Sequence, residues 1–319
     1  MKKLQYSASL KHAFSIFKRC GKFIGKIATN LNSLGASSAS HAIVSRAVLP
    51  ASYLKTPKLA LTSEFEIEVE SMNEQILEFT KITESGIAVE VLQIMPQAKV
   101  EGYVIALVGN CDFYQNHLDE LYQLAQSTKL GIMSFNYPKK ISSAAAVIAT
   151  FAELINPYLA EVGAKNIVLK GHSIGGAFAS YIAQGLHKKG HSIGLITDRS
   201  FTRLDLAAHE LMGITQKDAS FLLKTYGWEL NPEDVIGDID PTCQHHFFIE
   251  DDAVVKAQAS TRNYTSVPTE EIFPYVISAD GFLRHLLEIT DLKTKDKTPF
   301  LDRLNQVIKG FRRAPETAQ

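Results

Sequence analysis

The sequence predicts an α/β fold with a mostly parallel central sheet and helices on both faces. Short apolar runs alternate along the chain with longer segments of helical spacing, and this order implies right-handed crossovers between parallel strands. Several runs, such as Tyr103–Val108, are apolar almost throughout. Strands of that kind are covered on both faces, so helices are expected on each side of the sheet.

The expected strands are of two types. Glu64–Glu70 and Ile87–Met95 alternate apolar with polar residues, as half-buried antiparallel edge strands do. The more continuously apolar strands are Tyr103–Val108, Gly131–Asn136, Asn166–Lys170, Ser192–Thr197 and His246–Ile249. Helices are expected at Leu118–Ser127, Ser142–Val162, Gly175–Lys188, Asp205–Tyr226 and Pro299–Lys309.

The length fits about two domains or one large α/β domain, and the composition is that of an ordinary globular protein. The chain has 319 residues, of which 45% are hydrophobic and 21% charged, and this excludes disordered and collagen-like classes. The three cysteines, Cys20, Cys111 and Cys243, lie far apart in the sequence. Neither a disulfide framework nor a zinc site is therefore expected.

The N-terminal segment is basic throughout. The first acidic residue is Glu64, and every charge before it is a Lys or an Arg. Apolar residues recur at helical spacing over 10–31, with Arg19, Lys22 and Lys26 opposite them. Residues 1–31 are therefore expected to form a basic amphipathic helix that binds an anionic membrane surface or directs the protein to an organelle, although such a helix can also pack on the body.

The expected organisation follows from this charge asymmetry. Residues 1–62 are read as a basic arm and linker, with Leu34–Leu61 a loose connection, and residues 63–312 as the α/β domain, followed by a tail at 313–319. No nucleic-acid partner is expected. A cytoplasmic or peripheral membrane location is expected, with translocation or organelle targeting through the arm as the alternatives.

A glycine-rich motif lies between an expected strand and an expected helix. Asn166–Lys170 is followed by Gly171-His172-Ser173-Ile174-Gly175-Gly176. G-x-S-x-G in this setting is typical of a nucleophile elbow, in which a tight turn exposes the serine and small residues avoid clashes with neighbouring backbone. Ser173 is the predicted nucleophile.

With this motif in this setting, the chain resembles the α/β-hydrolase superfamily over Glu64–Arg312. The resemblance implies an α/β-hydrolase fold and a catalytic order of Ser, acid, His. It also implies an oxyanion hole made by the Ile174 N–H and by a donor in the Val108-Gly109-Asn110-Cys111 loop. Val108 stands where the family usually has His, and either Asn110 or Cys111 supplies the second donor.

The remaining catalytic residues are sought after the nucleophile. His285 is the last histidine in the chain and follows the last expected strand, so it is the predicted general base. The resemblance also implies an acid after the strand, followed by one residue of any kind and then two aliphatic residues. In Glu250-Asp251-Asp252-Ala253-Val254-Val255, Asp252 fits this pattern best and Asp251 is second. A minority of the superfamily places the acid after the preceding strand, where Asp198 stands. The alternative for Asp198 is a structural pair with a nearby Arg.

The segment Thr202–Pro241 is long for a crossover and carries the apolar residues Phe221, Leu222, Leu223, Tyr226 and Trp228. Residues 202–241 are a possible cap over the serine, which would suit a fatty-acyl substrate. The same residues could equally belong to the core.

The sequence contains no dinucleotide, P-loop, zincin or EF-hand motif, so neither a cofactor nor a metal is expected. The Gly109-Asn110 loop and Asp198-Arg199-Ser200-Phe201 are also similar to the SidB-like lipase-type effectors of intracellular bacteria, which would imply a translocated enzyme at a host membrane.

The predicted activity is hydrolysis of carboxylic esters of lipids or other acyl compounds. The alternatives are an acyltransferase or thioesterase on the same site, or a catalytically idle fold that serves as a membrane-docked interaction protein.

Overall fold

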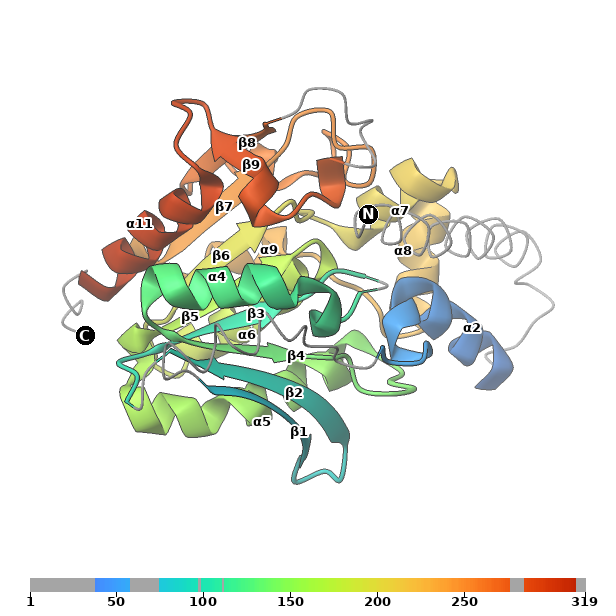
Figure 1. Cartoon of the computed structure of the whole chain (residues 1–319). Helices are drawn as coiled ribbons and strands as arrows, with labels where there is room; N and C mark the ends of the chain where they lie inside the picture. Colours follow the sequence, from blue (N-terminus) through green and yellow to red (C-terminus); the bar gives the residue numbers. More distant parts are fainter. Residues whose placement is uncertain (1–37, 58–74, 97–98, 111, 276–283, 314–319) are drawn as a thin grey trace.

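The computed structural model describes residues 38–57, 75–96, 99–110, 112–275 and 284–313. Its centre is one sheet in the order β1-β2-β4-β3-β5-β6-β7-β8-β9 (Figure 1). Neighbouring strands are parallel from β4 to β8, and β1, β2 and β9 are antiparallel at the two edges. The prediction of a mostly parallel α/β sheet is confirmed. The strands are β1 (Gln75–Ile82), β2 (Ala88–Met95), β3 (Tyr103–Leu107), β4 (Gly131–Phe135), β5 (Ile167–His172), β6 (Gly194–Asp198), β7 (Gln244–Phe248), β8 (Thr269–Pro274) and β9 (Leu292–Thr294).

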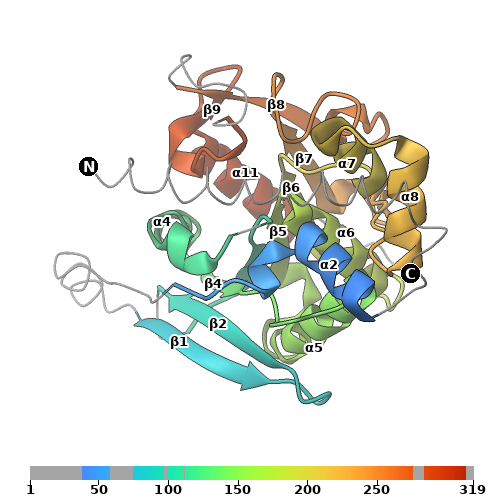
Figure 2. The ribbon, with the colours of Figure 1, turned by 90° about the vertical axis from the view of Figure 1, so that its right-hand side faces the viewer.

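Helices cover both faces of the sheet (Figures 1 and 2). α4 (Leu118–Thr128) and α11 (Phe300–Arg313) pack together on one face, and α5 (Ala144–Val162) and α6 (Ile174–His187) pack together on the other. By length and composition α5 could cross a membrane. Val147, Phe151 and Leu154 are nevertheless buried in the core, so α5 is a core helix here.

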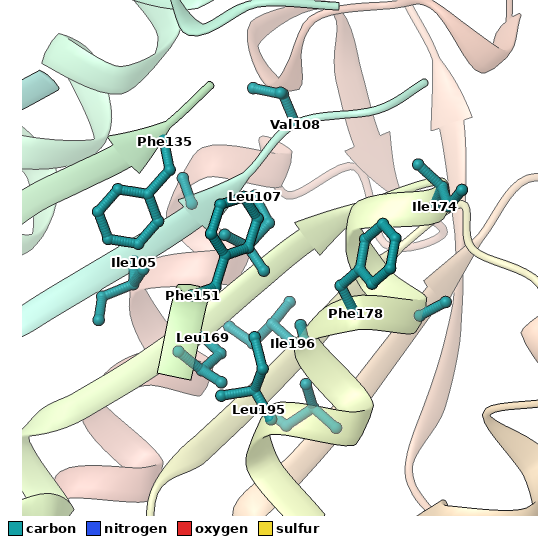
Figure 3. Packing of buried hydrophobic residues seen from close by; sticks show 14 of the residues in the cluster. Ile105, Leu107, Val108, Phe135, Phe151, Leu169, Ile174, Phe178, Leu195 and Ile196 are labelled. Carbon is teal, nitrogen blue, oxygen red and sulfur yellow. The ribbon is translucent and has the colours of Figure 1, made fainter. Parts of the chain in front are cut away.

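The core between the sheet and the α5–α6 layer is built from continuous apolar strands. Every residue of β3, β4 and β6 is buried. Phe151 of α5 and Phe178 of α6 lie over aliphatic side chains of the central strands (Figure 3). This packing fixes β5 and α6 relative to each other, and the turn that joins them carries Ser173.

The single helix expected over Asp205–Tyr226 is two helices, α7 (Leu204–Met212) and α8 (Gln216–Thr225). α7 ends at Gly213, whose φ of +70° is a left-handed conformation that glycine adopts without strain. Thr215 then caps α8, since its side chain accepts a hydrogen bond from the Asp218 N–H at 3.1 Å. A short helix, α9 (Glu233–Ile236), follows.

Part of the expected linker is ordered structure, so the prediction of a loose connection over Leu34–Leu61 is wrong for residues 38–52. α2 (Ser38–Val48) and a 3₁₀ turn at Pro50–Ser52 pack into the core, where Ala47 and Leu49 are fully buried. Trp228 Nε1 donates a hydrogen bond to Ser45 Oγ at 3.0 Å, which ties α2 to the segment that follows α8.

Some expected elements lie outside the described residues, namely the basic helix over 1–31 and the strand Glu64–Glu70. The strand that pairs with β2 at the edge is Gln75–Ile82. This strand was not predicted, and neither were β8 and β9.

Candidate active site

Ser173 lies at a strained turn between β5 and α6. Its φ of 53° and ψ of −123° are unusual for a residue other than glycine. A Cβ on Gly171 would lie 2.3 Å from Gly175 O, and one on Gly175 would lie 2.3 Å from Leu107 O. Larger residues at these two positions would push the turn apart, so the glycines allow the close approach that a nucleophile elbow requires.

His285 and Asp252 are joined by a buried hydrogen bond. The distance from His285 Nδ1 to Asp252 Oδ2 is 2.7 Å, and both side chains are almost completely buried. The other carboxylate oxygen, Oδ1, accepts hydrogen bonds from the N–H groups of Val254 and Val255 at 2.8 and 2.9 Å. With Asp252 ionised, Nδ1 carries the proton, and the Nε2 lone pair of a neutral His285 is left to accept one.

The other two carboxylates considered from the sequence have different partners. Asp251 is exposed and pairs with Arg284 at 3.0 Å. Asp198 is buried, and both its oxygens accept hydrogen bonds from Arg199, each at 2.8 Å. Burial opposes ionisation of Asp198, but the adjacent Arg199 guanidinium outweighs it and lowers the pKa of Asp198 to about 2. Only Asp252, of these three, contacts the His285 ring.

The His285 segment lies against His172, the residue that precedes Ser173. The rings of His172 and His285 are 4.9 Å apart, and His172 Nε2 donates to His285 O at 3.0 Å. Burial and the charge of Arg199 hold the pKa of His172 well below its usual range, so His172 is neutral. Among the described residues, no hydrogen bond joins Ser173 Oγ to His285; in unliganded enzymes this contact is often open.

The loop after β3 lies beside Ser173. A Cβ on Gly109 would lie 2.9 Å from His172 Nδ1 and 3.5 Å from Ser173 Cβ. The Tyr137 hydroxyl donates to Val108 O at 2.6 Å and holds the start of the loop. Asn110 lines the same pocket as Ser173 and Ile174. Cys111, the other oxyanion candidate, lies outside the described residues.

An apolar pocket opens at Ser173. Three groups of side chains form its walls, from α2, from α7 and α8, and from the residues after Asp252. They include Val44, Ala47 and Val48 of α2, Leu204, Ala207, Ala208, Leu211, Met212, Ala219, Leu222 and Leu223 of α7 and α8, and Val254 and Val255. Residues of the expected cap therefore both pack in the core and line the pocket.

Sequence reasoning missed two contributors to this region. α2 was missed, although Val44, Ala47 and Val48 have the spacing of one helical face. Arg199 is the second: the sequence suggests only an unspecified Arg near Asp198, and the contacts of Arg199 to the His285 segment join residues far apart in the sequence. As to metals, no group of three or more His, Cys, Asp or Glu side chains in the described ranges is placed to hold an ion.

No protein-family model matches the chain, and no curated protein matches it in sequence. Solved structures do match. An α/β-hydrolase from Vibrio vulnificus is 15% identical with a TM-score of 0.51, over 68% of this chain and 78% of that one. A fungal esterase from Rhizomucor miehei is 12% identical with a TM-score of 0.50, over 88% of this chain and 99% of that one. The chain has the α/β-hydrolase fold. The narrower resemblance to SidB-like effectors finds no support in these comparisons.

Proposed function

We propose that the protein is a serine hydrolase that cleaves carboxylic esters with an apolar acyl group. The observation that carries this proposal is the buried His285–Asp252 hydrogen bond, on a segment packed against His172 beside the strained Ser173. A nucleophile, a base with a free Nε2 and an acid that orients the base are the parts that acyl transfer requires.

In the proposed reaction, Ser173 Oγ attacks the ester carbonyl carbon while His285 Nε2 takes the hydroxyl proton. Asp252 keeps the Nδ1 proton in place and stabilises the imidazolium that forms. The Ile174 N–H and a donor from Asn110 or Cys111 stabilise the oxyanion. Collapse of the tetrahedral intermediate breaks the ester C–O bond, and His285 returns the proton to the leaving alcohol. Water then attacks the acyl-enzyme by the same steps, which releases the carboxylic acid and restores Ser173.

The apolar pocket supports an acyl substrate. It opens at Ser173 and is lined almost entirely by apolar side chains, so an acyl chain bound there would be removed from water at a gain of about 0.8 kcal/mol per methylene. Among the described residues that line this pocket, none has a charged side chain. We therefore propose neutral fatty-acyl esters, lipids among them, as the substrate class.

The test is labelling by a fluorophosphonate probe together with hydrolysis of p-nitrophenyl esters. Wild type is expected to label at Ser173 and to hydrolyse esters, while Ser173→Ala abolishes both and His285→Ala greatly reduces both. Well-folded wild type that neither labels nor hydrolyses any ester would contradict the proposal and favour a catalytically idle fold. Acyl transfer to an added alcohol or thiol in place of water would show an acyltransferase on the same site.

A further inference from the structure

Behind the His285 segment lies a buried ion pair that the proposed reaction does not use. Asp198 is the last residue of β6, and Arg199 follows it. Both side chains are almost fully buried. Lys170 Nζ lies 4.0 Å from Asp198 Oδ2. Buried charges are costly unless they are paired and fully hydrogen-bonded, so the contacts of this pair indicate what it does.

Asp198 fixes the orientation of the Arg199 guanidinium. Arg199 Nε donates to Oδ1 and Nη2 to Oδ2, both at 2.8 Å, in the two-pronged geometry that only an arginine can make. The low pKa of Asp198 keeps the carboxylate ionised. This arrangement leaves the remaining terminal nitrogen, Nη1, directed away from Asp198.

Arg199 Nη1 lies at the main chain that carries His285. It is within hydrogen-bond distance of three carbonyl oxygens, those of Arg284 at 3.1 Å, His285 at 3.1 Å and Leu287 at 2.8 Å. The His285 carbonyl also accepts from His172 Nε2 at 3.0 Å. One guanidinium group thus holds the backbone on both sides of His285, while Asp252 holds its ring.

We infer that Arg199 is a positioning residue for His285, an inference that rests on the proposed function. Arg199 does not touch the reacting atoms; it fixes the backbone from which His285 Nε2 must reach Ser173 Oγ. Lysine cannot replace it, because a single ammonium group cannot bind both oxygens of Asp198 and also reach three carbonyls. Asp198 acts one step further away, through Arg199. Loss of activity on changing Asp198 would therefore not identify it as the acid of the triad.

The experiment compares Arg199→Lys with a matched control, Arg203→Lys. Arg203 makes the same two-pronged contact with Asp205, at 3.0 and 2.9 Å, but its third nitrogen bonds Glu233, at 3.2 Å, and not the His285 segment. The measurements are kcat and KM for p-nitrophenyl butyrate, normalised to fluorophosphonate-labelled sites, and amide hydrogen exchange in peptides covering 284–291. Normalisation removes the effect of any unfolded fraction, which a purely structural role would change.

For Arg199→Lys we expect kcat per labelled site to fall about a hundredfold with KM within about twofold, since misplacing a catalytic group by about 1 Å has that effect. Exchange over 284–291 is expected to accelerate. Arg203→Lys should match wild type in both. If Arg199→Lys does not fold, Asp198→Asn/Arg199→Gln replaces it in the same measurements, because that pair leaves no unpaired buried charge.

An active wild type whose Arg199 variant keeps both kcat and exchange would overturn the inference and leave the proposed function standing. A folded wild type that neither labels nor hydrolyses esters would overturn both. Faster exchange with unchanged kcat would reduce Arg199 to a stabilising residue and equally overturn its positioning role.

Discussion

At the scale of single residues, three carboxylates near His285 have three different environments. Asp252 bonds the His285 ring, Asp251 pairs with Arg284 at the surface, and both oxygens of Asp198 are taken by Arg199. The sequence could not separate Asp251 from Asp252, because the two are adjacent in the chain and only the fold gives them different partners. Asp251, with a φ of 25°, is one of the few positive-φ residues other than glycine.

The first prediction separates these carboxylates. Asp252→Asn is expected to lower kcat about ten-thousandfold, as the corresponding change does in a serine protease, because an asparagine at this position favours the wrong histidine tautomer. Asp251→Asn should stay within about twofold of wild type, since the exposed pair with Arg284 contributes little. Both are measured on p-nitrophenyl esters, and full activity of Asp252→Asn would remove Asp252 from the triad.

At the scale of secondary-structure elements, the motif-bearing parts of the fold could be predicted, whereas the parts defined by tertiary contact could not. The strand, turn and helix around Ser173 were predictable because local glycines and apolar runs specify them. β8 was missed because Thr269–Pro274 carries two glutamates and ends in a proline, and β9 because it has three residues. α7 and α8 were merged because the apolar spacing continues across Gly213.

The second prediction concerns the apolar pocket at Ser173, which α7 and α8 help to line and where we propose that the acyl chain binds. Ala208→Phe, on α7, adds a ring to the pocket wall and should lower kcat/KM for long acyl chains more than for acetate, because each excluded methylene forfeits about 0.8 kcal/mol of transfer free energy. The measurement is the ratio of kcat/KM for p-nitrophenyl octanoate and acetate.

Phe221→Ser is the matched control for this change. Phe221 is 57% exposed on α8 and does not line the pocket, so the octanoate-to-acetate ratio should equal that of wild type. An unchanged ratio in Ala208→Phe would place the acyl chain elsewhere.

The third prediction belongs to the N-terminus of α8. Thr215→Ala removes the side-chain oxygen that accepts from the Asp218 N–H, and should lower the free energy of unfolding by about 1 kcal/mol. Urea denaturation measures this change. Thr215→Ser, which keeps the oxygen, should recover most of the loss; if serine and alanine were equally destabilising, the cap would not be the cause.

At the scale of the whole molecule, buried histidines make stability depend on pH. Burial, reinforced by His245, lowers the pKa of His246 to about 3, and both its ring nitrogens have hydrogen-bond partners, Thr197 Oγ1 and Gln244 Oε1. Between about pH 6.5 and 3 the unfolded chain binds a proton at His246 that the folded chain does not. Stability is therefore lost as the pH falls through this window.

The fourth prediction follows from the direction of this pH dependence. On lowering the pH from 6.5 to 4.5, the free energy of unfolding of wild type should fall faster than that of His246→Asn, by roughly 1 kcal/mol per pH unit. Urea unfolding at intervals of half a pH unit measures both. The variant starts less stable, because a well-packed ring is lost, so the slopes and not the absolute values are compared. Parallel curves would mean that His246 is not held neutral.

The last prediction concerns the basic residues 1–31, which lie outside the described part of the chain. If they bind anionic membranes, deleting them should lower binding to phosphatidylserine vesicles at least about tenfold, since each Lys or Arg near such a surface contributes about 1 kcal/mol. The deletion must end before Ser38, because α2 forms a wall of the pocket at Ser173. Hydrolysis of a soluble p-nitrophenyl ester should then be unchanged, and full-length Lys22→Glu/Lys26→Glu should reproduce the binding loss without any change in chain length. Equal sedimentation of all three proteins with the vesicles would show that the arm does not bind membranes, and loss of soluble-ester hydrolysis on deletion would show that it packs on the body instead.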